Sequence, residues 1–135
     1  MRSNYKVAMV LLAGVALGAL AVEGLHAQAK APVYYISEID VRDADAYAKE
    51  YAPKAQALIK ASGGRFVAVG GVAGNLAGKL TAFDGDAPKR ATVQVWDSVE
   101  KIKAWRASPE FVEVRKLGEK YATFSRGFAV DGVPE

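Results

Sequence analysis

Short runs rich in β-branched and aromatic residues recur along the chain, and they predict the strands of a sheet. Glycine, aspartate and proline bound these runs, as expected where the chain turns. The third run is the shortest, and we expect it to form an extra strand or hairpin in the middle of the fold. The five predicted strands are Val33–Val41, Arg65–Val72, Leu80–Phe83, Arg90–Trp96 and Ala122–Val130.

Apolar residues at steps of three and four predict a first helix between the first two strands. Asp43 stands where an N-cap belongs, because its carboxylate can accept hydrogen bonds from the first backbone amides. Gly63 follows the last apolar position and favours a C-terminal cap. Pro53 lies inside this segment and crowds the carbonyl of Lys49, so we expect a kink or a restart there.

A second helical pattern precedes the last strand. Asp97 and Glu100 have the spacing of a capping box, so we expect Asp97 to be the N-cap. Ser108 and Pro109 then provide an N-cap and a proline suited to the first helical position. The second helix is therefore predicted to break and restart at Ser108.

The predicted elements follow the order β-α-β-β-α-β, with the short extra strand in the middle. This is the ferredoxin-like arrangement of the α+β class, in which two helices cover one face of an antiparallel sheet. The other face must be polar or must pair with another chain. Because aromatic and hydrogen-bonding side chains are mixed on it, we expect a homodimer closed through this face. Alternation assigns to it Tyr34, Ile36, Glu38, Asp40, Thr92, Gln94 and Trp96.

Residues 1–29 have the pattern of a secretory signal. A short basic segment precedes the uncharged run 7–22, and Ala27 and Ala29 occupy the positions that a signal peptidase inspects. The alternative is an uncleaved anchor, which needs about 20 apolar residues, more than this run has. We therefore expect cleavage and an exported domain over residues 30–135, periplasmic or secreted.

The composition limits the chemistry of this domain. The chain has no cysteine, and its one histidine, His26, lies in the leader. This excludes histidine-dependent catalysis, zinc sites with nitrogen or sulfur ligands, and haem ligation by these residues, so we expect no cofactor and no metal. The formal net charge is +3 and no basic run exceeds two residues. Neither a nucleic acid nor, after cleavage, a membrane is expected as a partner.

Several segments occur in an order and spacing that resemble the DUF1330 family. The resemblance covers Val33–Gly132 and implies a small dimeric α+β-barrel protein whose biochemical role is not established. At the level of the fold, the family is similar to dimeric barrels that include cofactor-independent monooxygenases and haem-degrading enzymes. This chain has Asp84 where the family commonly has Glu, and Phe111 where it commonly has Tyr. The matching segments are Tyr47 with Tyr51, Gly63-Gly64-Arg65, Asp84-Gly85-Asp86 and Trp105 through Phe111.

Two charged residues are candidates for a ligand site. Arg65 follows two glycines at the start of a strand, where its guanidinium could hold a carboxylate or phosphate in two hydrogen bonds. Its alternative role is a salt bridge to Asp84 or Glu110. Asp84 could act as an acid, a base or a partner of Arg65, but aspartate in such a turn more often bonds to backbone amides.

Three further candidates lie on the predicted helices and strands. Trp96 suits an interface or the wall of a ligand site. Tyr51 lies on the apolar helix face, so its hydroxyl needs a partner or a cavity. Arg126 shares strand parity with Phe124 and needs a buried anion or carboxylate, unless a bulge at Gly127 turns it outward.

These observations leave three hypotheses about function. The first is a homodimeric protein that binds a small anionic or aromatic molecule, or serves as an accessory protein. The second is a cofactor-independent oxygenase or isomerase with a carboxylate such as Asp84 as base. The third is a purely structural dimer.

Overall fold

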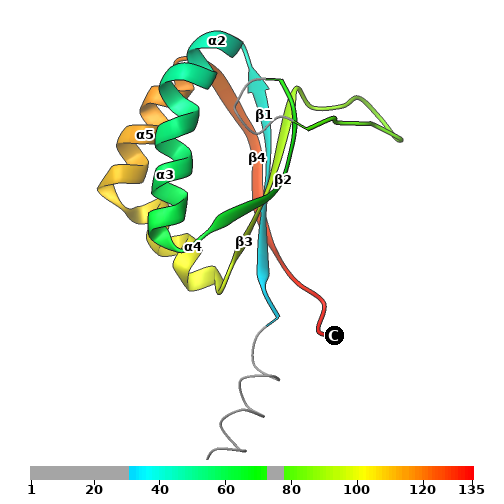
Figure 1. The fold of residues 1–135 in the computed structure, drawn as a ribbon, viewed down its shortest axis with the longest axis vertical. Coiled ribbons are helices and arrows are strands. Elements are labelled where there is room, and N and C mark those ends of the chain that lie inside the picture. Colours follow the sequence, from blue (N-terminus) through cyan, green and yellow to red (C-terminus); the bar gives the residue numbers. More distant parts are fainter. Residues whose placement is uncertain (1–30, 73–77) are drawn as a thin grey trace, which may run out of the picture. The chain divides into compact units, whose positions relative to one another are not determined.

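Four antiparallel strands form one sheet (Figure 1). Their order is β2-β3-β1-β4, the ferredoxin-like order. The computed structural model describes residues 31–72 and 78–135, so the predicted leader over residues 1–29 lies outside the described residues. The strand limits agree with the expected ones to within a residue at each end. The strands are β1 (Val33–Val41), β2 (Arg65–Gly71), β3 (Arg90–Trp96) and β4 (Ala122–Asp131).

The predicted strand at Leu80–Phe83 is wrong. Beyond β2, the described residues meet the edge of the sheet only in an isolated bridge between Gly70 and Gly78. The run is short, and its largest apolar side chain, Phe83, is 92% exposed. It therefore gains no buried surface that would hold a further strand on the sheet.

Helices on one face cover the sheet, and no helix of the described residues covers the other face (Figure 1). Both predicted helices are interrupted, as their sequences indicate. The first consists of α2 (Ala44–Ala46), the π-helical segment η1 (Tyr47–Tyr51) and α3 (Ala52–Ser62); the second consists of α4 (Val99–Ala107) and α5 (Pro109–Glu119).

The π-helical segment resolves the conflict that Pro53 creates. Asp43 caps the start of this helix as predicted, accepting a hydrogen bond from the amide of Ala46 at 3.1 Å. Pro53 lies in the first turn of α3, where its missing N–H costs least, so the helix restarts there. The wider turn before it buries both Tyr47 and Tyr51, with ring centroids 4.9 Å apart. At the other end, Gly63 ends α3 at a φ of 106°, which glycine adopts without strain.

The second helix begins one residue later than predicted. Ser98 is the N-cap and accepts from the amide of Lys101 at 3.2 Å, so the expectation for Asp97 is wrong. Asp97 instead forms an ion pair with Lys101 Nζ at 2.9 Å. The predicted break is confirmed: Ser108 Oγ accepts from the amide of Phe111 at 3.2 Å and donates to the carbonyl of Trp105 at 2.7 Å.

The register between β1 and β3 corrects the predicted faces of the sheet. Val33 pairs with Trp96 and Tyr35 with Gln94, and directly opposed residues of an antiparallel pair point to the same face. Trp96 therefore lies under the helices, where it is 2% exposed. It does not lie on the face that the helices leave uncovered, which we call the open face. The same correction applies to Thr92 and Gln94, which are also buried. Alternation alone could not assign these faces, because both sides of β3 carry apolar residues.

The open face of the sheet is largely apolar. Two neighbouring rows of residues cross β3, β1 and β4, and Phe128 and Val130 on β4 remain 46% and 48% exposed. The third row carries an ion pair between Glu38 and Arg126. The residues of the two apolar rows are Val95, Tyr34 and Val130, and Val93, Ile36 and Phe128.

A bulge in β4 settles the direction of Arg126. Ile39 pairs with Phe124, but the preceding residue of β1, Glu38, pairs with Arg126, so Ser125 is the extra residue. The bulge thus lies two residues before the expected position at Gly127. Because of the extra residue, Phe124 and Arg126 point to opposite faces of the sheet. Arg126 therefore points to the open face, as its partner Glu38 does.

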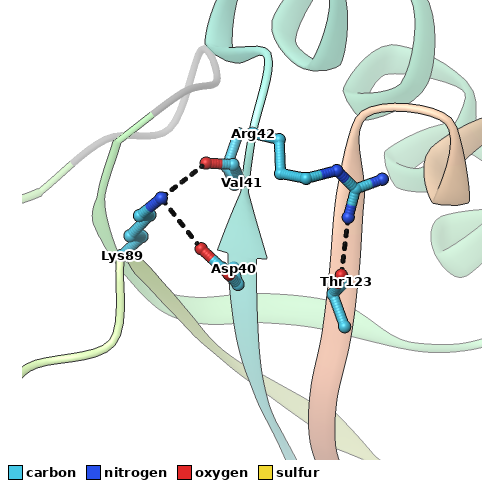
Figure 2. A network of polar contacts seen from close by, with 5 residues as sticks. All are labelled: Asp40, Val41, Arg42, Lys89 and Thr123. Carbon is cyan, nitrogen blue, oxygen red and sulfur yellow. Dashed lines mark hydrogen bonds and ion pairs between the residues drawn. The ribbon is translucent and has the colours of Figure 1, made fainter.

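Polar contacts fix the end of β1 to its neighbours (Figure 2). Lys89 Nζ lies 3.0 Å from Asp40 Oδ1 and donates to the carbonyl of Val41 at 3.5 Å. On the other side, Arg42 donates to Thr123 Oγ1 at 2.5 Å and to the carbonyl of Glu119 at 2.7 Å. The second bond caps the C-terminus of α5, where a cation is favoured. Within residues 31–72 and 78–135, no helix is long and apolar enough to cross a membrane.

Candidate functional site

A small cavity lies between the sheet and the helices, at the place where two parts of the core meet. Its volume is about 40 Å³. One part of the core contains Tyr47 and Tyr51, and the other contains Tyr35 and Trp105. The remaining polar lining comes from β1, β3 and the helices: Ser37, Gln56, Arg90, Thr92, Gln94 and Arg115.

Among the residues of this lining, Gln56 Nε2, Trp105 Nε1 and Arg115 Nε are buried nitrogen atoms that have no hydrogen-bond partner among the described residues. Trp105 and Arg115 can only donate. In native proteins nearly all buried polar groups are hydrogen-bonded, and leaving one unsatisfied costs about 1–3 kcal/mol. All three belong to residues that line one cavity, which marks this cavity as a candidate polar site.

Arginine side chains dominate the electrostatics of the cavity. Arg90 is 2% exposed, and its guanidinium carbon lies 5.4 Å from the centroid of the Tyr47 ring. Burial raises the pKa of Tyr47, although the nearby charge of Arg90 acts in the opposite direction. Burial also raises the pKa of Tyr51, and the neighbouring Tyr47 adds to that shift. Both phenols are therefore neutral at physiological pH.

A second hollow of about 120 Å³ adjoins the cavity. Tyr35, Ser37, Arg115 and Phe124 line both spaces, so we call this hollow the mouth of the cavity. Arg106 from α4 also lines the mouth. Among residues 31–72 and 78–135, no aspartate or glutamate lines either space.

The guanidinium of Arg115 lies over two aromatic rings. Its central carbon lies 4.9 Å from the ring centroid of Phe111 and 3.9 Å from that of Phe124. Arg106 approaches the same Phe111 ring, at 5.0 Å. Stacking of this kind fixes the plane of a guanidinium and leaves its edge free to donate.

The structure does not bring the five candidates from the sequence together. Tyr51 lines the cavity, and Trp96 is buried in the same core, outside the cavity lining. Arg65 and Asp84 are exposed and line neither the cavity nor its mouth. Arg126 reaches the rim of the mouth, but its Nε forms an ion pair with Glu38 on the open face.

The polar residues that do converge were missed from the sequence for identifiable reasons. Arg90 alternates with Thr92, Gln94 and Trp96 on one side of a strand, and this pattern marks a polar interior face once the register is known. Arg115 follows Phe111 by four residues, one helical turn, so it shares the helix face of an aromatic residue. This spacing of an arginine and an aromatic residue could have indicated that Arg115 lies beside the core. Within the described part of the chain, no group of three or more histidine, cysteine, aspartate or glutamate side chains could hold a metal ion.

Comparison with solved structures supports the fold. A crystal structure of a protein of unknown function from Rhodopseudomonas palustris matches with a TM-score of 0.59 and 15% identity, covering 85% of this chain and 93% of that one. SnoaB, a cofactor-independent oxygenase from Streptomyces nogalater, matches with a TM-score of 0.54 and 16% identity, covering 77% of this chain and 95% of that one. At such identities the likeness concerns the fold alone.

Comparison with protein sequences gives the family. No curated protein matches the chain. Residues 32–133 match the model of DUF1330, a domain of unknown function, as the resemblance in the sequence predicted. The match spans all four strands and both interrupted helices. The chain therefore belongs to the DUF1330 family.

Proposed function

We propose that this protein is an exported homodimer that binds a small molecule in the cavity between its sheet and its helices. The observation that carries the proposal is that Gln56, Trp105 and Arg115, which all line that cavity, each have a buried donor without a partner among the described residues. A bound molecule that accepts hydrogen bonds would satisfy them, as buried polar groups require. Binding sites typically combine an apolar, aromatic wall with a few converging polar groups, and this cavity has both.

The homodimer rests on the open face of the sheet. Its two apolar rows, including Ile36, Phe128 and Val130, form a contiguous surface that no helix of the described residues covers. Contiguous apolar patches on a soluble domain mark interaction surfaces. A second copy of the chain offers the same patch, so a two-fold contact would bury both at once.

Export rests on the leader pattern over residues 1–29. A domain without cysteine gains nothing from the oxidising conditions outside the cytoplasm. Its stability must therefore come from packing, to which the homodimer would contribute.

The second candidate function is a cofactor-independent oxygenase or isomerase. The observation in its favour is the enclosure of the cavity by the aromatic side chains of Tyr47, Tyr51 and Trp105, because such chemistry needs a site that excludes water. It also needs a base. Asp84 lies outside the cavity, so this candidate would require a base other than the carboxylate first considered.

Native mass spectrometry of the protein purified from the exported fraction tests these proposals together. We expect a dimer of chains beginning at Lys30, with a small molecule retained on each. Release of the retained molecule unchanged after aerobic incubation supports a binding protein, and its conversion supports the enzyme. A dimer without a ligand, even after incubation with extracts of the producing cells, would favour the purely structural alternative.

A further inference from the structure

The chemistry of the cavity and its mouth points to a particular class of ligand. We infer that the site binds a small carboxylate that carries a second oxygen acceptor, such as a 2-oxo acid. The inference rests on the proposed function, because it names what the cavity would hold. It depends on four properties of the described residues: the donors that lack partners, the charge of the lining, the geometry of Arg115 and the space available.

The unsatisfied groups select for acceptors. Trp105 Nε1 and Arg115 Nε each carry an N–H group and can only donate hydrogen bonds. The side chain of Gln56 adds an amide that donates or accepts. A molecule that completes this site must therefore bring at least two acceptor atoms, one for Arg115 and one for Trp105.

The charge of the lining selects for an anion. Arg106 and Arg115 both stack on Phe111, and neither forms an ion pair with any described residue. Two cations on one ring repel each other, and the lining supplies no carboxylate to compensate. Bringing a negative charge to the mouth relieves this repulsion and forms charge-assisted hydrogen bonds.

The geometry of Arg115 favours a planar anion. All N–H groups of a guanidinium lie in its plane, so Arg115 donates from its edge while the rings of Phe111 and Phe124 lie close to its central carbon. An edge of two parallel N–H groups matches the two oxygens of a carboxylate. This places the carboxylate at the mouth, where Arg115 lines both spaces.

The available space limits the size of the ligand. The inner cavity of about 40 Å³ has room for about three water-sized groups. The mouth adds about 120 Å³. A carboxylate at the mouth with a two- or three-carbon chain and one oxygen directed toward Trp105 meets these limits, whereas a nucleotide or a sugar phosphate does not.

Isothermal titration calorimetry with three matched probes tests the inference. Pyruvate has the carboxylate and a second acceptor, propionate lacks the second acceptor, and acetone lacks the charge. We expect saturable binding of pyruvate, binding of propionate weakened by about tenfold, and no measurable binding of acetone. Inorganic phosphate is the fourth probe, and we expect it to bind more weakly than pyruvate.

Variants assign the binding to the residues named. Arg115→Met keeps an apolar stem between the two rings and should weaken pyruvate binding by at least about tenfold. Arg115→Lys keeps the charge but loses the planar edge, so it should recover only part of the affinity. Lys103→Met removes a positive charge from the exposed surface of α4 and should leave binding unchanged. Circular dichroism of each variant checks that it is folded.

The outcomes separate this inference from the proposed function. Acetone binding as tightly as pyruvate would leave the cavity as a binding site and overturn the choice of an anion. Phosphate binding more tightly than pyruvate would overturn the choice of a carboxylate. Unchanged pyruvate binding in Arg115→Met, or no binding of any probe, would overturn the inference. A different small molecule retained in native mass spectrometry would still support the proposed function.

Discussion

Arg106 on α4 donates a hydrogen bond from Nη1 to the phenolic oxygen of Tyr35 on β1, at 2.7 Å. The same guanidinium lies 5.9 Å from the centroid of the Tyr35 ring. This pair joins a helix to the central part of the sheet at the mouth of the cavity. It therefore positions Arg106, which lines the mouth together with Arg115 and Arg126.

Removing the hydroxyl of Tyr35 should loosen the mouth without disturbing the core. Tyr35→Phe loses one hydrogen bond to a charged group, so we expect the free energy of unfolding to fall by about 1–2 kcal/mol. Because Arg106 is then less fixed, pyruvate affinity should fall several-fold. Urea unfolding and calorimetry measure the two effects. An unchanged affinity in a variant of the expected stability would show that Arg106 has no part in the site.

The buried phenol of Tyr51 makes stability depend on alkaline pH. Burial raises the pKa of Tyr51 in the folded state above the ordinary tyrosine value of about 10. As the pH rises through about 10, the unfolded chain therefore loses this proton first, and unfolding is favoured. The contribution of the protonated Tyr51 phenol to the free energy of unfolding is fully present below that pH and is lost as the pH rises above it.

Urea unfolding from neutral pH to about pH 11 checks this expectation. Tyr51→Phe should be less sensitive to alkaline pH than the unmodified protein. Parallel curves for the two proteins would show that Tyr51 ionises equally in the folded and unfolded states.

Ser108 is expected to matter for stability and not for binding. Its hydroxyl caps α5 and also bonds to the last turn of α4, so Ser108→Ala should cost about 1 kcal/mol. Ser108→Asp keeps the acceptor for the amide of Phe111 and should recover most of the loss. Thermal unfolding provides the comparison. A loss of pyruvate binding in a folded Ser108→Ala protein would contradict a purely structural role.

The proposed homodimer should depend on the apolar rows of the open face. Phe128 lies within these rows, so Phe128→Asp should place a charge in the interface and give a monomer in analytical ultracentrifugation. Phe83→Asp is the matched control, because Phe83 is 92% exposed and lies outside every strand. A dimer that persists in Phe128→Asp, or an unmodified protein that is monomeric at micromolar concentration, would contradict the proposed interface.

Local sequence signals predicted the elements well, and their limits were set by nonlocal effects. The ends of β1 and β3 follow directly from runs of β-branched and aromatic residues. Pro53 correctly indicated a restart, because a proline without an N–H forces a change in the hydrogen bonding of the helix. The expected N-cap at Asp97 failed because Ser98, one residue later, has an equally suitable hydroxyl.

The site was less predictable, because it depends on strand register and on the meeting of distant elements. Trp96 was assigned to the wrong face until its pairing with Val33 was known. Arg126 could not be placed without the bulge at Ser125. Arg115 lies far along the chain from Tyr35, and only the packing of α5 against the sheet brings both to one cavity. Of the residues first considered, only Tyr51 lines that cavity.

The indole N–H of Trp105 provides the most direct test of the account. The chain has two tryptophans, and Trp96 Nε1 already donates to Gln94 Oε1 at 2.8 Å, so it serves as an internal reference. In ¹H–¹⁵N spectra recorded during a titration with pyruvate, the Trp105 indole signal should move downfield as the N–H gains an acceptor, while the Trp96 signal stays nearly in place. Saturating pyruvate that leaves the Trp105 signal unmoved would contradict the account.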